Sequence, residues 1–151
     1  MQQLAKAIAI TSAAFSEDLD KGGVPYIMHC LHVMSIVGKK TDNDPEMMCI
    51  AVMHDLKEDK PNWTDQRLLD EGFSCRVVRG IDSMTHRHNQ TYQEYLEQVT
   101  RNSDAVIVKK VDIKHNSDIH RQPAPLSLKA FKRIEKYHKA YAYLMDPTQW
   151  S

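Results

Sequence analysis

Residues 45–59 constrain the fold most, because they join an apolar helix to a cluster of ionisable groups. From Met48 to Met53 the side chains are apolar on almost every side of a helix, which predicts a helix at the centre of a bundle. The chain then reads His54-Asp55-Leu56-Lys57-Glu58-Asp59. On a continuing helix, residues four apart share a face, which predicts His54 beside Glu58 and Asp55 beside Asp59. Carboxylates gathered in this way repel one another unless they take up protons or a cation binds, so the segment is either a metal site or a solvated acidic helix end.

Helical spacing of apolar residues dominates the rest of the chain. The 151 residues include only five glycines and six prolines, and no Asn-Gly or Asp-Gly pair suggests a hairpin. We therefore predict a single all-α domain over residues 1–151, with about seven to eight helices. The helices are expected near residues 2–19, 26–39, 45–59, 65–71, 74–84, 91–101, 103–118 and 127–145. Expected N-caps are Asp44, Thr64 and either Ser103 or Asp104.

Composition excludes several classes of partner. Lys plus Arg and Asp plus Glu both number 20, so no overall basic field points to nucleic acid or to a membrane surface. The three cysteines, Cys30, Cys49 and Cys75, lack CxxC spacing and lie in apolar surroundings, which predicts reduced core thiols in an intracellular protein. No stretch has the length of a membrane span or the basic start of a signal peptide, so a cytoplasmic location is expected.

Candidate metal ligands lie on three of the predicted helices: His29, His54, Asp55 and Asp112. Asp112 directly follows a buried apolar run, where a carboxylate needs a metal, a lysine or a helix cap as its partner. Helical bundles build interior metal sites from side chains on facing helices in this way. Mixed nitrogen and oxygen ligands suit manganese, iron or zinc, and the ligand types do not choose among them.

Three segments carry a resemblance to a known family. They are Gly23-Val24-Pro25-Tyr26-Ile27-Met28-His29, His54-Asp55-Leu56-Lys57-Glu58-Asp59 and Lys109-Lys110-Val111-Asp112-Ile113-Lys114-His115-Asn116. Their content and order resemble the motifs of the RelA/SpoT-type hydrolase domain, within the HD-domain metal phosphohydrolase superfamily. The likeness is strongest to small stand-alone alarmone hydrolases, which also carry a segment similar to Thr85-His86…Tyr92-Gln93-Glu94-Tyr95.

The resemblance implies an all-α HD-domain bundle and a manganese-dependent enzyme. Its substrate would be a guanosine alarmone such as ppGpp, cleaved to GDP and pyrophosphate. His29, His54, Asp55 and Asp112 would bind the metal, Glu58 and Asp59 would be the acid/base pair, and Lys21 and Asn116 would lie near the nucleotide. From their charge, Lys109, Lys110 and Arg133 are further candidates for holding phosphate.

The sequence departs from the family pattern on the substrate side. Asp20 and Asp118 stand where many members have arginine, and Ile113-Lys114 replaces an Arg-Leu pair. Two alternatives therefore stay open: an HD-domain phosphohydrolase acting on another nucleotide, such as a dNTP or a nucleoside monophosphate, and a nucleotide-binding regulator without activity. Residues 85–90 are likewise either a plain surface loop or a loop that faces the substrate.

Overall fold

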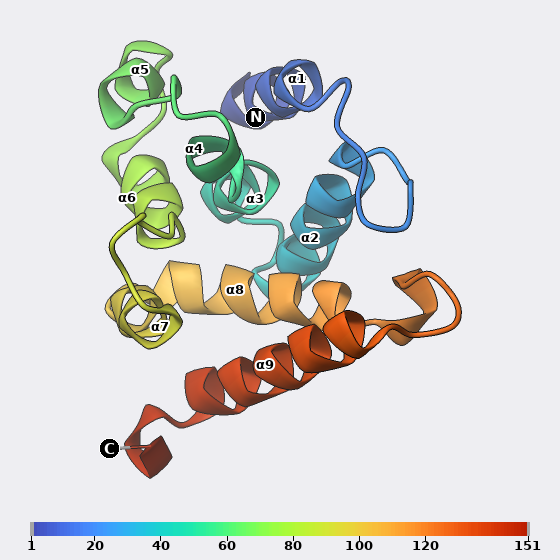
Figure 1. Cartoon of the computed structure of the whole chain (residues 1–151). Helices are drawn as coiled ribbons and strands as arrows, with labels where there is room; N and C mark the ends of the chain where they lie inside the picture. The colour runs from blue at the N-terminus through green and yellow to red at the C-terminus, as the bar shows by residue number, and fades with distance from the viewer. Residues whose placement is uncertain (1, 151) are drawn as a thin grey trace.

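The computed structural model describes residues 2–150 and, of these, the side chains up to Thr148. The regular elements in this part of the chain are all helices, joined by loops, and it contains no strand, which confirms the predicted all-α fold (Figure 1). The helices are α1 (Gln2–Ala14), α2 (Ile27–Lys40), α3 (Pro45–Val52), α4 (Leu56–Asp59), α5 (Asp65–Asp70), α6 (Cys75–Ser83), α7 (Tyr92–Thr100), α8 (Ser103–Asn116) and α9 (Leu128–Met145), with short 3-10 helices η1 (Ile119–Arg121) and η2 (Pro147–Trp150).

Local capping interactions start most of these helices. The Asp44 side chain accepts hydrogen bonds from two backbone N–H groups of α3, and Thr64 caps α5, both as predicted. The predicted cap of α8 was wrong by one or two residues. Asn102, rather than Ser103 or Asp104, accepts from the backbone N–H groups of Asp104 and Ala105. The first helix is also shorter than expected and ends at Ala14.

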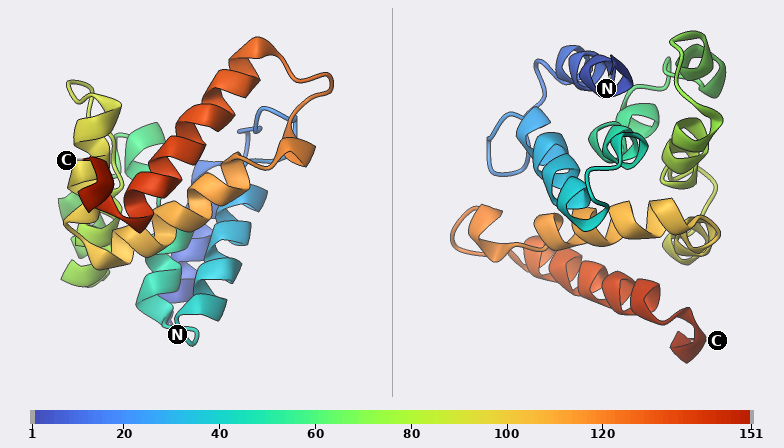
Figure 2. Two further views of the ribbon diagram at one scale, coloured as in Figure 1. Left: turned by 90° about the horizontal axis from the view of Figure 1, so that it is seen from below. Right: turned by 180° about the vertical axis from the view of Figure 1, so that it is seen from behind.

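Helix α3 lies at the centre of the bundle, as the sequence predicted. Every side chain from Cys49 to Met53 is fully buried, and α3 contacts α1, α2, α6 and α8. Helix α8 crosses the molecule beneath α2 and α3, and α9 packs along the opposite side of α8 (Figure 1; Figure 2). The candidate site therefore lies where α2, the end of α3 and α8 meet.

The predicted continuous helix over residues 45–59 is wrong, because the chain leaves the helix at Met53–Asp55 and restarts as α4. The His54 ring nitrogen Nδ1 lies 2.7 Å from the carbonyl oxygen of Ala51. In an uninterrupted helix that carbonyl would accept the backbone N–H of Asp55. The side chain therefore competes with the backbone for the same acceptor and helps end α3 here.

The cysteines divide between core and surface. Cys30 and Cys49 are buried free thiols, as predicted, whereas Cys75 is exposed at the first position of α6. The prediction for Cys75 was wrong because its position on α6 faces solvent rather than α3. None of the helices described is both long enough and apolar enough to cross a membrane.

Candidate active site

Four side chains from separate elements converge beside the end of α3. His29 comes from α2, His54 and Asp55 from the turn between α3 and α4, and Asp112 from α8. His29, His54 and Asp112 are almost fully buried, with 2%, 0% and 2% of their surface exposed. The structure thus brings together all four candidate ligands proposed from the sequence.

The ligand atoms are spaced as they would be around one ion. His29 Nε2 lies 3.3 Å from His54 Nε2 and 3.1 Å from Asp112 Oδ1, and His54 Nε2 lies 3.0 Å from Asp55 Oδ2. Ligands about 2.1 Å from a common metal lie roughly 3.0–3.4 Å apart when adjacent in octahedral or tetrahedral geometry. His29, His54 and Asp55 form the compact group, and Asp112 approaches it through the two histidines.

The hydrogen bonding of His54 fits a cation at this point. The Ala51 carbonyl can only accept a hydrogen bond, so Nδ1 of His54 carries the proton. In the neutral ring, Nε2 then presents a lone pair to the carboxylates of Asp55 and Asp112, which is repulsive unless a proton or a metal lies between them. Burial alone would lower the pKa of His54, but the charges of the two carboxylates outweigh it and raise that pKa well above its usual value.

His115 supports the second imidazole. Its Nδ1 lies 2.7 Å from Nδ1 of His29, and its ring stacks on His32. Burial, reinforced by the charge of Arg121, lowers the pKa of His115 to about 4, so the ring is neutral near pH 7. A neutral His115 can accept the Nδ1–H of His29, which leaves Nε2 of His29 free to bind a metal. His32, three residues after His29 on α2, lies outside the ligand group.

The two candidate carboxylate ligands are held by neighbouring donors. The Tyr26 hydroxyl donates to Asp55 Oδ2. Lys109 Nζ donates to Asp112 Oδ2 at 2.8 Å, and Asn116 Nδ2 donates to Asp112 Oδ1 at 2.7 Å. Although burial opposes ionisation, the Lys109 charge holds the pKa of Asp112 well below its usual range. Lys109 and Asn116, proposed from the sequence as substrate residues, therefore also orient a candidate ligand.

Glu58 and Asp59 line the same cavity as Asp55 and Asp112, a space of about 300 Å³. Glu58 accepts a hydrogen bond from the backbone N–H of His86 at 2.9 Å. Burial and the neighbouring charges of Asp55 and Glu58 raise the pKa of Asp59 to about 6. Asp59 therefore changes protonation close to neutral pH, as a proton-transfer group would.

An adjoining cavity of about 250 Å³ contains the other proposed substrate residues. Lys21 and Arg133 line it, and Asn116 is shared with the first cavity. Lys110 lies elsewhere, in a separate groove beside Lys114 and Met145. Lys110 therefore lines neither of the two cavities, because a helix turns Lys109 and Lys110 to different faces.

Asp20 and Asp118, which stand where many RelA/SpoT-type domains have arginine, both have partners in the structure. Asp20 accepts two backbone hydrogen bonds within its own loop and pairs with Arg121 at 2.8 Å. Arg121 lines the adjoining cavity, so this cavity has an arginine supplied by η1, although Asp20 stands where the family carries one. Asp118 caps η1 through the backbone N–H of His120. No sequence pattern pointed to the Asp20–Arg121 pair, whose members lie 101 residues apart.

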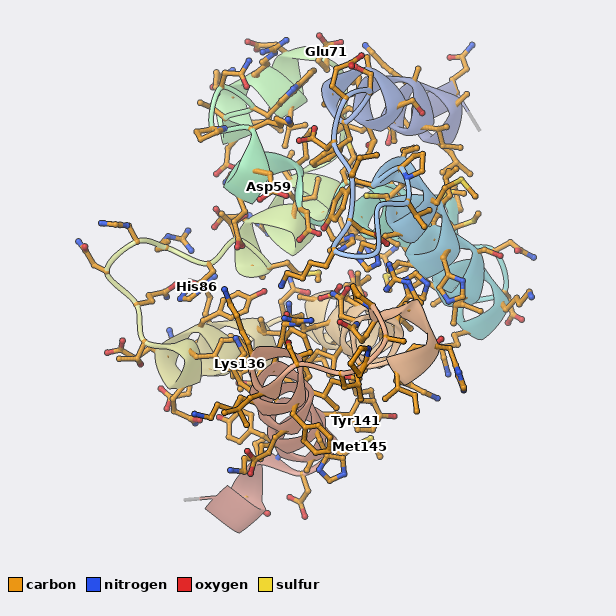
Figure 3. The ribbon with its side chains drawn as sticks, turned by 45° about the vertical axis from the view of Figure 1, so that its right-hand side comes forward. Asp59, Glu71, His86, Lys136, Tyr141 and Met145 are labelled. Atoms are coloured by element: carbon orange, nitrogen blue, oxygen red, sulfur yellow. The ribbon has the colours of Figure 1, made fainter. Side chains whose placement is uncertain are left out.

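Sequence reasoning missed several residues that line the first cavity. Tyr92, Tyr95, Tyr137 and Lys136 all do so, although Lys136 is also exposed to solvent. His86 lines it too, which favours the substrate-facing interpretation for that part of the 85–90 loop. Figure 3 shows Lys136 extending from α9 toward this loop, with Asp59 above it. The Tyr-x-x-Tyr spacing from Tyr92 to Tyr95 was the one available signal.

Sequence comparison alone places the chain in no known group, since no family model and no curated protein matches it. Its fold is similar to the solved structure of a metazoan ortholog of SpoT that hydrolyses ppGpp and plays a role in starvation responses. The TM-score is 0.79 with 16% sequence identity, over 97% of this chain and 86% of that chain. The chain thus has the all-helical architecture of that ppGpp hydrolase, which agrees with the all-α bundle predicted from the sequence.

Proposed function

We propose that this protein is a metal-dependent phosphohydrolase that cleaves ppGpp to GDP and pyrophosphate. The observation that carries the proposal is the group of His29, His54 and Asp55, joined by Asp112, at the wall of a cavity. The similarity of fold to a protein that hydrolyses ppGpp supports this substrate. The three motifs shared with alarmone hydrolases point in the same direction.

The four ligands would hold one divalent ion, for which we favour manganese. Two imidazole nitrogens and two carboxylate oxygens also suit iron or zinc. Such an ion would lower the pKa of a water molecule and offset the negative charge of a phosphoryl oxygen. Tyr26, Lys109 and Asn116 would keep the two carboxylates in place for it, and His115 and the Ala51 carbonyl would do so for the imidazoles.

Glu58 and Asp59 would divide the work of proton transfer. Asp59 is the better proton acceptor, because its raised pKa of about 6 lies close to neutral pH. Glu58 is tied to the His86 backbone, so it is suited to holding the 85–90 loop against the cavity. Asp59 would take a proton from the attacking water and return it to the leaving oxygen.

The adjoining cavity would hold the nucleotide part of the substrate. Lys21, Arg121 and Arg133 supply positive charge there, and Asn116 lies at the junction of the two cavities. One observation favours a second candidate, hydrolysis of another nucleotide. The Asp20 carboxylate neutralises part of the positive charge on Arg121, which weakens the attraction for a 5′-diphosphate and favours a substrate with less 5′ charge, such as a nucleoside monophosphate.

A nucleotide panel tests the proposal. Purified protein with manganese is incubated with ppGpp, GTP, a dNTP mixture or GMP, and the products are separated by anion-exchange chromatography. We expect GDP and pyrophosphate from ppGpp, and neither product from an Asp59→Asn variant. Turnover of dNTPs or GMP without turnover of ppGpp would support the second candidate instead.

A further inference from the structure

The cavity that Asp55 and Asp112 line also has two side chains in its wall, Tyr92 and Lys136, that the proposed mechanism does not use. The Tyr92 hydroxyl is buried in the wall of this cavity and, among the residues described, has no hydrogen-bond partner. Lys136 lines the same cavity, and no described carboxylate pairs with it. Its ammonium lies 4.5 Å from the centre of the Tyr92 ring and 5.2 Å from that of Tyr137.

A buried hydroxyl without a partner is costly, so such groups usually meet a ligand or an ordered water. The lysine is held in place by its contacts with two aromatic faces rather than by an ion pair. The ammonium of Lys136 can only donate hydrogen bonds, and the Tyr92 hydroxyl has a proton that no described acceptor takes. Donors of this kind match a ligand that is rich in charged oxygen acceptors.

The two cavities divide the substrate between them. Asp55 and Asp112, the two candidate ligands that are carboxylates, line only the first cavity, whereas Lys21 and Arg133 line only the adjoining one. The cavities meet at Tyr26, Asn116 and Tyr137. With the nucleotide part of the substrate in the adjoining cavity, as the proposed function has it, a phosphoester cleaved beside Asp55 and Asp112 would have its leaving phosphates on the Tyr92 side.

We propose that Tyr92 and Lys136 form the binding subsite for the pyrophosphate that leaves the substrate. This inference rests on the proposed function for the direction of the reaction. The binding itself needs only an inorganic polyphosphate anion in the first cavity. Both residues contact the leaving group, and neither takes part in proton transfer.

Calorimetric titration tests the subsite with two ligands in turn, inorganic pyrophosphate and GDP. The protein is first loaded with manganese and then freed of excess manganese. The variants are Tyr92→Phe, which removes one oxygen atom, and Lys136→Met, which keeps the aliphatic stem over the rings. Matched controls are Tyr141→Phe, in the groove on the other side of α8, and Lys132→Met, on the exposed face of α9.

We expect each subsite variant to weaken pyrophosphate binding about tenfold, the effect of losing a hydrogen bond to a charged ligand. GDP binding should stay unchanged, and both controls should bind pyrophosphate as the wild type does. Weakened GDP binding with unchanged pyrophosphate binding would assign this wall to the nucleoside and overturn the proposal. Wild-type protein that binds no pyrophosphate would overturn it as well.

Thermal unfolding separates a role of the Tyr92 hydroxyl in stability from a role in binding pyrophosphate. Because the hydroxyl has no described partner, Tyr92→Phe should leave the unfolding temperature of the ligand-free protein unchanged or slightly higher. The rise in unfolding temperature that pyrophosphate causes should become smaller in the same variant. If the wild type fails to hydrolyse ppGpp, the proposed function falls, but the pyrophosphate titration still decides whether the subsite exists.

Discussion

The imidazole of His54 acts on both the backbone and the candidate metal site. Its Nδ1–H donates to the Ala51 carbonyl, which helps end α3 and turns Asp55 toward the ligand group. The same hydrogen bond determines which ring nitrogen keeps a lone pair. Both effects need the ring to be buried against Asp112 of α8, so they depend on packing between distant segments as well as on the local sequence.

Replacing a ligand carboxylate by its amide tests the metal site at single-residue scale. Asp55→Asn and Asp112→Asn keep the side-chain shape but remove a negative charge from the site. Loss of a group that only hydrogen-bonds to a metal ligand lowers metal affinity roughly 10–100-fold. Because these carboxylates would bind the metal directly, we expect manganese affinity to fall by more than that. Calorimetry with manganese measures this. Asp59→Asn is the matched control and should bind manganese normally while losing turnover; stoichiometric manganese in Asp55→Asn would exclude Asp55 as a ligand.

The raised pKa of Asp59 predicts how the turnover number falls at acidic pH. Burial, together with the charges of Asp55 and Glu58, raises its pKa to about 6, and only the ionised form can accept a proton. The turnover number should therefore fall as the pH drops through the pKa of Asp59. That pKa is about 6 without a metal, and a bound cation should lower it, so the fall in rate should begin at a somewhat lower pH. Steady-state rates between pH 4.5 and 8 check the prediction. A rate that stays constant down to pH 4.5 would rule out Asp59 as the base.

At the scale of the helices, Arg76 in the first turn of α6 forms ion pairs with the N-terminal ends of α3 and α8. Arg76 donates to Asp44, the cap of α3, and to Asp104 in the first turn of α8, both at 2.8 Å. These contacts fix the ends of the helices that deliver His54 and Asp112 at their other ends. Gly80, one turn further along α6, lets this helix approach α3 so closely that an added Cβ would lie 2.5 Å from Ile50.

Arg76→Met should destabilise the protein by about 1 kcal/mol at pH 7, a value kept small because the side chain is 41% exposed and solvent screens the pairs. Burial alone would raise the pKa of Asp44, but the hydrogen bonds from Arg76 and from the α3 backbone lower it below the value of 3.8. A carboxyl group with a lowered pKa in the folded state stabilises above its unfolded pKa, and this contribution is lost as the pH falls through the folded pKa.

Urea unfolding at pH 7 and pH 3 measures this dependence. The difference between wild type and Arg76→Met should shrink at pH 3. Arg79→Met, an exposed arginine on the same helix with no ion pair among the described residues, is the control and should change stability little at either pH. An equal loss from Arg76→Met at both pH values would show that its effect does not come from ionised carboxylates.

At the scale of the whole molecule, the candidate ligands join segments that are distant in sequence. His29, His54 with Asp55, and Asp112 belong to α2, to the α3–α4 turn and to α8. A bound ion would therefore link these three segments in the folded state only. Any ligand that binds only the folded protein stabilises it in proportion to the logarithm of its concentration.

Manganese at about 100 times its dissociation constant should stabilise the fold by about 2.7 kcal/mol. For a chain of this size, that corresponds to a rise of about 5–10 °C in the unfolding temperature. Calorimetric unfolding with manganese and with a chelator measures the shift. The Asp112→Asn variant should show almost none of it, and an unchanged unfolding temperature in saturating manganese would contradict a site that spans three helices.

The sequence by itself predicted the helical class, most helix ends and the four candidate ligands that the structure brings together. Apolar spacing and caps such as Asp44 and Thr64 act over a few residues, so they can be recognised without knowing the fold. The ligands could be chosen because three motifs matched one family pattern. Their convergence then followed from the bundle that the pattern implies.

Only the tertiary structure decided what surrounds the ligands. The break at His54 requires a ring buried between α2 and α8, and the Asp20–Arg121 pair joins residues 101 positions apart. Lys136 and Tyr92 reach the cavity because α7, α8 and α9 pack together, although on α9 alone Lys136 belongs to a charged face. Contacts between distant segments depend on how helices cross and which side chains fill the space between them, and a pattern of local spacing does not contain that information.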